Sequence, residues 1–321
     1  MYSFPMKNLL ENNPLILVDV GASGGVHKRW HHYGVGVKTI LFEPDYEEFV
    51  KLVSKKSENS LVINSALAEK SKIVDFNICK WQEASSIYTP NQSLLDRYED
   101  SERFNIERTV SLEADSINSL LQKENINEID FIKIDTQGSE LDILKGATSF
   151  YDNLIGLEVE VEFIELYQKQ PLFSEVNSFI ESKGFSLVDL KRTYWRRKAK
   201  NYSNRKGELI SADALYFKEP ENIIALNNLN QEKIIRSIHT YLAYGYDDLA
   251  KTLLDLSEKD GLLSKESKQG INKLLNDFKT EYVLPNFKGK GRIKDLINFF
   301  GAKFSEKTFS SGNDTKIGNL E

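Results

Sequence analysis

The chain has 321 residues, of which 40% are hydrophobic and 11% aromatic, enough to build a sizeable core. The net charge of -6 argues against a protein that binds nucleic acid through bulk charge. The single cysteine, Cys79, excludes an internal disulfide and fits a reducing compartment. The apolar run 15–18 near the start is too short for a signal peptide or a membrane span, so we expect a cytoplasmic protein without a membrane span.

Apolar runs typical of buried strands alternate with helix-like segments over the first two thirds of the chain. The runs lie at 15–20, 37–42, 61–63, 129–134 and 154–161. This alternation predicts an α/β fold, a parallel sheet covered by helices. The runs 73–78 and 109–112 are expected to form short additional strands near an edge, and Asp115 is expected to cap the helix that follows.

The later part of this region predicts a helix and a strand pair. The amphipathic segment 172–183 predicts a helix that Gly184 closes, and 185–190 and 212–217 predict two strands joined by the basic loop 191–206. From Glu219 only helical patterns remain. We therefore expect one domain over 1–218, a helical extension over 219–308 and a disordered tail over 309–321.

A glycine-rich turn follows the first strand, in the sequence LILVDVGASGG. A nicotinamide site would prefer G-x-G-x-x-G, whereas here Asp19 precedes Gly21 by two positions. That order is typical of S-adenosylmethionine sites, because a carboxylate offsets the positive charge that the cofactor carries. The alternative is a capped structural turn. Glu43 ends the second strand, where an acid can accept both ribose hydroxyls, and Pro44 stiffens the turn behind it.

The segment 131–147, FIKIDTQGSELDILKGA, joins a buried strand to an acid and then to a helix. Phe131 and Ile134 predict a parallel strand buried on both faces, ending at Asp135. Gly138 allows a tight turn, and the apolar residues after it recur at helical spacing. The carboxyl end of such a strand opens into a crevice, so Asp135 is a candidate reaction-centre residue.

Taken in order, these motifs resemble those of the FkbM-type S-adenosylmethionine-dependent methyltransferases. The matching pieces are VDVGASGG, FEPD, NSALAE, ASSIYTPN, IDFIKIDTQGSELDILKGA, EVEFIELYQKQPLF and SADALYFK, and they cover residues 12–218. The resemblance implies a Rossmann-like, seven-stranded class I methyltransferase sheet whose last two strands are antiparallel, with the basic loop between them. Ser23 stands where family members often have asparagine.

The resemblance also implies roles for residues around an S-adenosyl-L-methionine cofactor. Asp19, Gly21, Ser23 and Gly25 would hold the methionine end, with Ala22 in the same turn, and Glu43 and Pro44 would hold the ribose. Asn64, Ser65 and Ala66 would surround the adenine, and Asp135 would face the sulfonium or the substrate.

Methyl transfer to a hydroxyl needs a group that removes the proton. The sequence LEVEVEF places Glu158, Glu160 and Glu162 on one face of a strand, and Glu160 is the strongest candidate because the strand should end near Asp135. A solvated strand face is the alternative for the other two glutamates. Asp135 and Glu160 would act as the catalytic base pair or would bind a divalent metal such as Mg²⁺.

The basic loop offers cations and aromatic rings for an acceptor. Arginines bind phosphate and rings stack on sugars, so a carbohydrate or phosphate-bearing glycan acceptor is expected; a solvated hairpin tip is the bland alternative, and RNA binding is weaker still. The predicted substrate-binding residues are Ser86, Gln137, Tyr194, Trp195, Arg196 and Arg197.

The family resemblance favours O-methylation of a sugar hydroxyl on a polysaccharide precursor or a glycosylated metabolite. A nicotinamide-dependent oxidoreductase and a non-catalytic scaffold that acts through the helical tail are the competing hypotheses. The helical extension is also a candidate surface for a homodimer.

Overall fold

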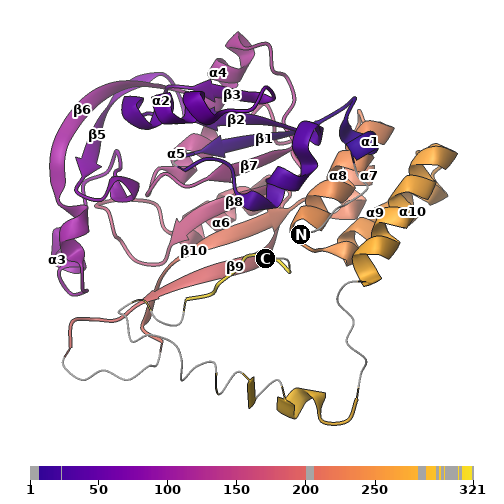
Figure 1. Cartoon of the computed structure of the whole chain (residues 1–321). Coiled ribbons are helices and arrows are strands. Elements are labelled where there is room, and N and C mark those ends of the chain that lie inside the picture. The colour runs from indigo at the N-terminus through magenta and orange to yellow at the C-terminus, as the bar shows by residue number, and fades with distance from the viewer. Residues whose placement is uncertain are drawn as a thin grey trace.

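A computed structural model describes residues 7–22, 24–199, 206–280, 287–293, 296–297, 300, 310 and 313–319. Its centre is a seven-stranded sheet in the order β3-β2-β1-β7-β8-β10-β9 (Figure 1). The strands are β1 (Leu15–Val20), β2 (Val37–Phe42), β3 (Ser60–Ile63), β7 (Phe131–Ile134), β8 (Gly156–Glu162), β9 (Ser186–Trp195) and β10 (Glu208–Phe217). All neighbours pair in parallel except β10, which is antiparallel to both β8 and β9. This is the Rossmann-like class I methyltransferase sheet that the sequence predicts.

The extra strands form a sheet of their own, which corrects the expectation of two short edge strands. β4 (Ala66–Leu67), β5 (Lys72–Cys79) and β6 (Ile106–Asp115) make a three-stranded sheet in the order β4-β6-β5. The predicted cap of the next helix is also wrong by one residue. Ser116 caps it by accepting a hydrogen bond from the Ser119 amide, because a hydroxyl at this position reaches the free N–H of the first turn.

One face of the main sheet is covered by the helices between the strands. These are α4 (Ile117–Lys123), α5 (Glu140–Lys145) and α6 (Phe173–Ser182). Period-two alternation sends Leu157 and Val159 of β8 into this layer, where they are fully buried. Gly184 follows α6 with a φ of +85°, the left-handed conformation predicted for the residue that closes this helix.

The helical extension covers part of the opposite face, as Figure 1 shows. It comprises α7 (Pro220–Ile224), α8 (Gln231–Ala243), α9 (Asp247–Lys259) and α10 (Lys265–Thr280). Leu17, Phe131 and Leu215 of the sheet share one hydrophobic core with Ile238 and Leu253 of the extension. The two predicted parts of the chain therefore do not have separate cores.

Buried charges join the extension to the sheet. Asp130 is fully buried and lies 2.7 Å from the Lys233 ammonium and 3.0 Å from the Arg236 guanidinium, both on α8. Its other oxygen accepts the amide N–H of Ile16 at the start of β1. One carboxylate thus fixes α8 against two neighbouring strands.

The remaining described elements are short, apart from one ten-residue helix. They are α1 (Lys7–Leu10), α2 (Tyr46–Lys55), α3 (Gln92–Leu95) and the 3-10 helices η1 (Lys28–Gly36), η2 (Gln82–Ala84) and η3 (Ser101–Phe104). Among the described residues, none of the helices combines the length and apolar character needed to cross a membrane.

Residues 313–319 lie against the sheet, although they fall in the range predicted to be disordered. The Asp314 amide donates to the Arg192 carbonyl of β9 at 2.9 Å, and the Arg192 amide donates back to the Asp314 carboxylate. Ile317 is 2% exposed, and the Gly318 amide donates to Asp189 at 2.6 Å. We call this segment the C-terminal strap; it covers the open edge of β9.

Candidate functional site

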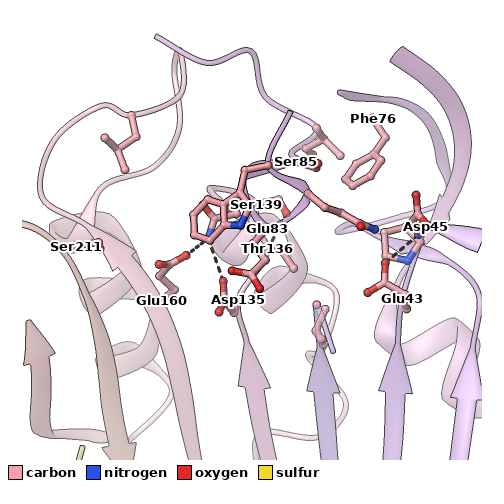
Figure 2. A pocket seen from close by; sticks show the side chains of 18 of the residues that line it. Glu43, Asp45, Phe76, Glu83, Ser85, Asp135, Thr136, Ser139, Glu160 and Ser211 are labelled. Atoms are coloured by element: carbon pink, nitrogen blue, oxygen red, sulfur yellow. Dashed lines mark hydrogen bonds between the residues drawn. The ribbon is translucent and has the colours of Figure 1, made fainter. Parts of the chain in front are cut away.

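A cavity of about 580 Å³ opens at the carboxyl ends of the central strands. Figure 2 shows the strands pointing into it, with Glu43 and Asp45 at one end, Glu160 and Ser211 at the other, and Asp135 between them. This is the edge at which parallel α/β sheets bind ligands. Nine of the predicted site residues line the cavity: Gly21, Glu43, Pro44, Ser65, Ala66, Asp135, Gln137, Glu160 and Trp195.

The turn after β1 requires a glycine at its first position. Gly21 has a φ of +75°, and a Cβ atom there would lie 1.9 Å from the carbonyl oxygen of Asp135. Its amide donates to the Phe42 carbonyl at 3.2 Å. The absence of a side chain therefore lets the ends of β1, β2 and β7 approach one another at the base of the cavity.

A partly buried lysine links the two predicted acids of β1 and β7. The Lys133 ammonium lies 3.7 Å from a carboxylate oxygen of Asp19 and 3.7 Å from one of Asp135. Burial raises the pKa of Asp19 to about 6, and Lys133 partly offsets that rise. Burial alone would lower the pKa of Lys133, but the nearby carboxylates outweigh it and raise that pKa. Lys133 is a site residue that sequence reasoning passed over as a strand residue.

Asp19 itself lies just behind the cavity wall. It is 3% exposed, and its Oδ1 atom accepts no hydrogen bond from the described residues, although the Lys133 ammonium lies 3.7 Å from it. A buried carboxylate oxygen without a donor fits a cationic ligand group nearby, such as the ammonium of S-adenosylmethionine. Ala22 is also buried, and Gly25 lies outside this cavity, in a second hollow beside η1. The predicted contact of Ser23 lies outside the described residues.

The other end of the cavity fits an adenosine. Glu43 accepts the Asp45 amide at 2.9 Å through Oε1, while Oε2 accepts no hydrogen bond from any part of the chain that the structure describes. Burial raises the pKa of Glu43 to about 7. The Asn64 amide group donates to the carbonyls of Glu43 and Pro44, so Asn64 supports this turn from behind. Leu67 and Phe76 of the small sheet add an apolar wall.

Gln137 bridges the two predicted catalytic acids. Its Nε2 donates to Asp135 Oδ1 at 3.1 Å and to Glu160 Oε2, and its Oε1 accepts the Tyr167 hydroxyl at 3.1 Å. Gln137 has a φ of +58°, which is costly for a residue with a side chain. Burial, and then the charge of Asp135, raises the pKa of Glu160 well above its ordinary value. The structure thus brings Asp135 and Glu160 together around one amide group.

The loop that presents Gln137 is held by a carboxylate that sequence analysis did not single out. Glu140 is 2% exposed and accepts hydrogen bonds from the amides of Thr136 at 2.8 Å and Gly138 at 3.0 Å. Burial raises the pKa of Glu140, and these hydrogen bonds oppose the rise. Ser86 supports the same loop from the other side, since its buried hydroxyl donates to the Gln137 carbonyl at 2.6 Å.

The predicted basic loop is shorter than expected, because β9 runs on to Trp195. Trp195 packs edge-on against Tyr98 at 5.6 Å while it also lines the cavity. Arg197 pairs with Glu208 at 2.6 Å, and Arg196 is 6% exposed. Tyr194 lies 4.5 Å from the Lys206 ammonium. Of the four loop residues predicted to bind substrate, only Trp195 is placed in the cavity wall.

We call the end of the cavity that holds Glu160 and Ser211 the acceptor end. Its other residues come from segments far apart in the sequence. The Arg103 guanidinium lies 5.0 Å from the Trp81 ring and 4.6 Å from the Trp195 ring. Asn313, on the C-terminal strap, accepts the Tyr194 amide at 2.7 Å. The residues of this end are Trp81, Gln82, Glu83, Arg103, Thr193, Trp195, Ser211, Ser310 and Asn313. No local motif marks them, because the tertiary fold assembles them.

The predicted metal finds no support. Among the residues that the structure describes, no group of three or more histidine, cysteine, aspartate or glutamate side chains is arranged to hold a metal ion. The amide nitrogen of Gln137 also lies between the carboxylates of Asp135 and Glu160. A hydrogen-bond donor in that place already satisfies the oxygens that a metal would bind.

Comparison with known proteins gives one family match. The family model described as "Methyltransferase FkbM domain" matches residues 19–187. No curated protein sequence matches the chain.

Several solved structures are similar at a low level. Human methyltransferase-like protein 13 in complex with SAH has 12% identity and a TM-score of 0.34, over 92% of this chain and 94% of that one. TrmK of M. capricolum in complex with SAH has 9% identity and a TM-score of 0.31, over 87% and 97%. Precorrin-6y C5,15-methyltransferase of Geobacter metallireducens has 10% identity and a TM-score of 0.30, over 63% and 77%.

Proposed function

The chain belongs to the family of FkbM methyltransferase domains and is an S-adenosylmethionine-dependent methyltransferase; from that premise we propose that its acceptor is a hydroxyl group of a carbohydrate. The observation that carries the proposal is the composition of the cavity, in which two indole rings and several hydroxyl and amide side chains line the same space as Glu160. A sugar ring offers apolar C–H faces to aromatic rings and hydroxyls to polar side chains. Membership of this family argues against the two competing hypotheses, a nicotinamide-dependent oxidoreductase and a non-catalytic scaffold.

Different residues at the other end of the cavity would hold different parts of the cofactor. The Glu43 carboxylate is placed to accept ribose hydroxyls, and Ser65, Ala66 and Phe76 surround the adenine position. Asp19 and Lys133 lie behind Gly21, where they set the charge around the methionine end. When bound, S-adenosylmethionine supplies an electrophilic methyl group on a sulfonium.

The acceptor hydroxyl loses its proton as its oxygen bonds to the methyl carbon, so a base must lie beside it. We assign that role to Glu160, because it lines the cavity beside Gln137 and because burial raises the pKa of its carboxyl group, which makes the carboxylate a stronger base. Gln137 holds the Glu160 carboxylate in place, and Asp135 adds negative charge nearby. The side chains of Trp195 and Ser211 are placed to orient the sugar.

The phosphate-binding role predicted for the basic loop has less support than the carbohydrate role. Arg197 is already paired with Glu208, and Arg196 is buried outside the cavity wall. We therefore propose that the cavity contacts the sugar portion of the acceptor, a polysaccharide precursor or a glycosylated metabolite.

The test measures transfer of labelled methyl groups to a panel of monosaccharides and oligosaccharides. Glu160→Gln keeps the shape of the side chain and should lower turnover at least ~100-fold, the usual contribution of a general base. S-adenosylhomocysteine affinity, measured by calorimetry, should stay unchanged. Glu113→Gln, at an exposed carboxylate on β6, is the matched control.

Two results would contradict the proposal. Wild-type turnover in Glu160→Gln would remove that residue from the reaction. Methylation of a hydroxyl in a protein or a lipid, with every carbohydrate refused, would remove the sugar acceptor while leaving the methyltransferase assignment intact.

A further inference from the structure

Described helical residues near the end of the chain, 290–293, 296–297 and 300, expose apolar side chains. In Figure 1 these residues lie apart from the sheets and from α7–α10. Ile293, Leu296, Ile297 and Phe300 follow helical spacing, and their side chains are 48%, 55%, 64% and 50% exposed. Phe287, just before the helix, is 51% exposed. Positions separated by three, four and seven residues share one face of a helix, so the four side chains form one apolar stripe.

Basic residues accompany this stripe. Over 287–300 the sequence has four basic residues and one acid, and 287–293 holds Lys288, Lys290 and Arg292 with no acid. This contrasts with the net charge of -6 for the whole chain. An apolar face beside a local excess of cations is the composition of helices that lie in the surface of an anionic membrane.

We propose that the apolar stripe and the cations of 287–293 act as an interfacial anchor that binds the protein reversibly to the surface of a membrane containing anionic lipid. The apolar stripe enters the boundary between headgroups and acyl chains, and the cations remain at the level of the lipid phosphates. A helix of this kind lies in one surface of the membrane and does not cross it. The proposal does not depend on the identity of the acceptor.

A second copy of the chain is a poorer occupant of this stripe. Two antiparallel copies would bring their excess cations together, which costs free energy unless acids intervene. The four residues of the stripe also lie within a single stretch of about one heptad of sequence, whereas a paired coiled coil needs three or four heptads. An anionic membrane satisfies both the apolar side chains and the charges.

The anchor lies close in sequence to a residue that lines the cavity. Ser310, which lines the acceptor end, follows Phe300 by ten residues. Ten residues span at most ~36 Å even when fully extended. A bound membrane therefore lies within that reach of the acceptor end, a suitable place for an acceptor that is itself attached to lipid.

The full chain is tested by co-sedimentation with phosphatidylcholine vesicles made with and without phosphatidylglycerol. Binding should require phosphatidylglycerol and weaken as salt rises, because the Debye length falls from ~10 Å at 0.1 M to ~3 Å at 1 M. The variant Ile293→Asp/Ile297→Asp should bind at least ~tenfold more weakly, since it removes two large apolar groups from the stripe. Its circular dichroism and its S-adenosylhomocysteine affinity should match the wild type.

The matched control places the same substitutions on another helix. Val50→Asp/Val53→Asp alters two apolar side chains of α2 that are 46% and 39% exposed, and it should bind vesicles like the wild type. Absence of binding to anionic vesicles at low salt would overturn the proposal, as would equal loss in both variants. A wild-type dimer that becomes a monomer in Ile293→Asp/Ile297→Asp, without vesicle binding, would assign the stripe to a second copy instead.

Discussion

The close approach at Gly21 predicts an unusually large effect for the smallest possible substitution. In Gly21→Ala the new Cβ would have to move from 1.9 Å to at least 3.0 Å from the Asp135 carbonyl oxygen. The φ of +75° adds ~1–2 kcal/mol of conformational strain. Separating the strand ends adds ~1–3 kcal/mol of overpacking. We expect the free energy of unfolding to fall by ~2–5 kcal/mol in total.

Gly184→Ala isolates the conformational part of that loss. Gly184 has a similar φ of +85°, but a Cβ there would meet no atom within 4 Å. Its free energy of unfolding should fall by only ~1–2 kcal/mol in urea titrations of both variants. S-adenosylhomocysteine affinity should be lost in Gly21→Ala and kept in Gly184→Ala. Equal destabilisation and equal affinity in the two variants would refute the argument that close packing, and not φ alone, demands Gly21.

Three further predictions follow from buried charges and from the strap. Burial raises the pKa of Glu43 to about 7, so the folded state holds this proton longer than the unfolded state. The free energy of unfolding should therefore fall by up to ~1.4 kcal/mol per pH unit as pH rises from ~4.5 to ~7; urea titrations should show this contribution missing in Glu43→Gln. Asp130→Ala should cost ~3 kcal/mol in the same assay, because it removes the fully buried partner of Lys233 and Arg236 and leaves them paired with Glu128, whose side chain is 41% exposed. Removal of residues 310–321 should raise the KM for the acceptor and leave S-adenosylhomocysteine affinity unchanged, since Ser310 and Asn313, its described residues in the cavity wall, belong to the acceptor end.

The strands of the main sheet, and the residues at their carboxyl ends that line the cavity, could be predicted because their signals are local. The apolar run 131–134 followed by an acid predicts the end of a buried strand. The observed β7 ends at Ile134, one residue before Asp135. The placement of the three glutamates of β8 on one face of the strand could be predicted from period-two alternation alone. Such patterns depend only on residues a few positions apart.

The acceptor end could not be predicted in the same way. Arg103 and Trp81 approach Trp195 only because the small sheet and β9 meet in the folded chain. Trp195 itself was found, but its three neighbours in the predicted loop were expected in the cavity for their charge and aromatic character. β9 continues through Trp195 and sends alternate side chains away from the cavity, a consequence of pairing with β10 that composition does not reveal.

The face of the sheet toward the helical extension brings the extension into contact with both the apolar core and the charged residues near the cavity. Leu17 and Phe131 lie under the extension, and two residues later on the same strands Asp19 and Lys133 begin the charged region. Tyr244 sits at the boundary, where its ring packs on Phe131 at 5.3 Å and its hydroxyl donates to Glu158 at 2.6 Å. The end of α8 therefore seals the apolar core and orients a carboxylate beside the site. An extension that only recognised a partner would not need to complete the core of the sheet. Removal of the helical extension should therefore unfold the sheet rather than change which acceptor the protein uses.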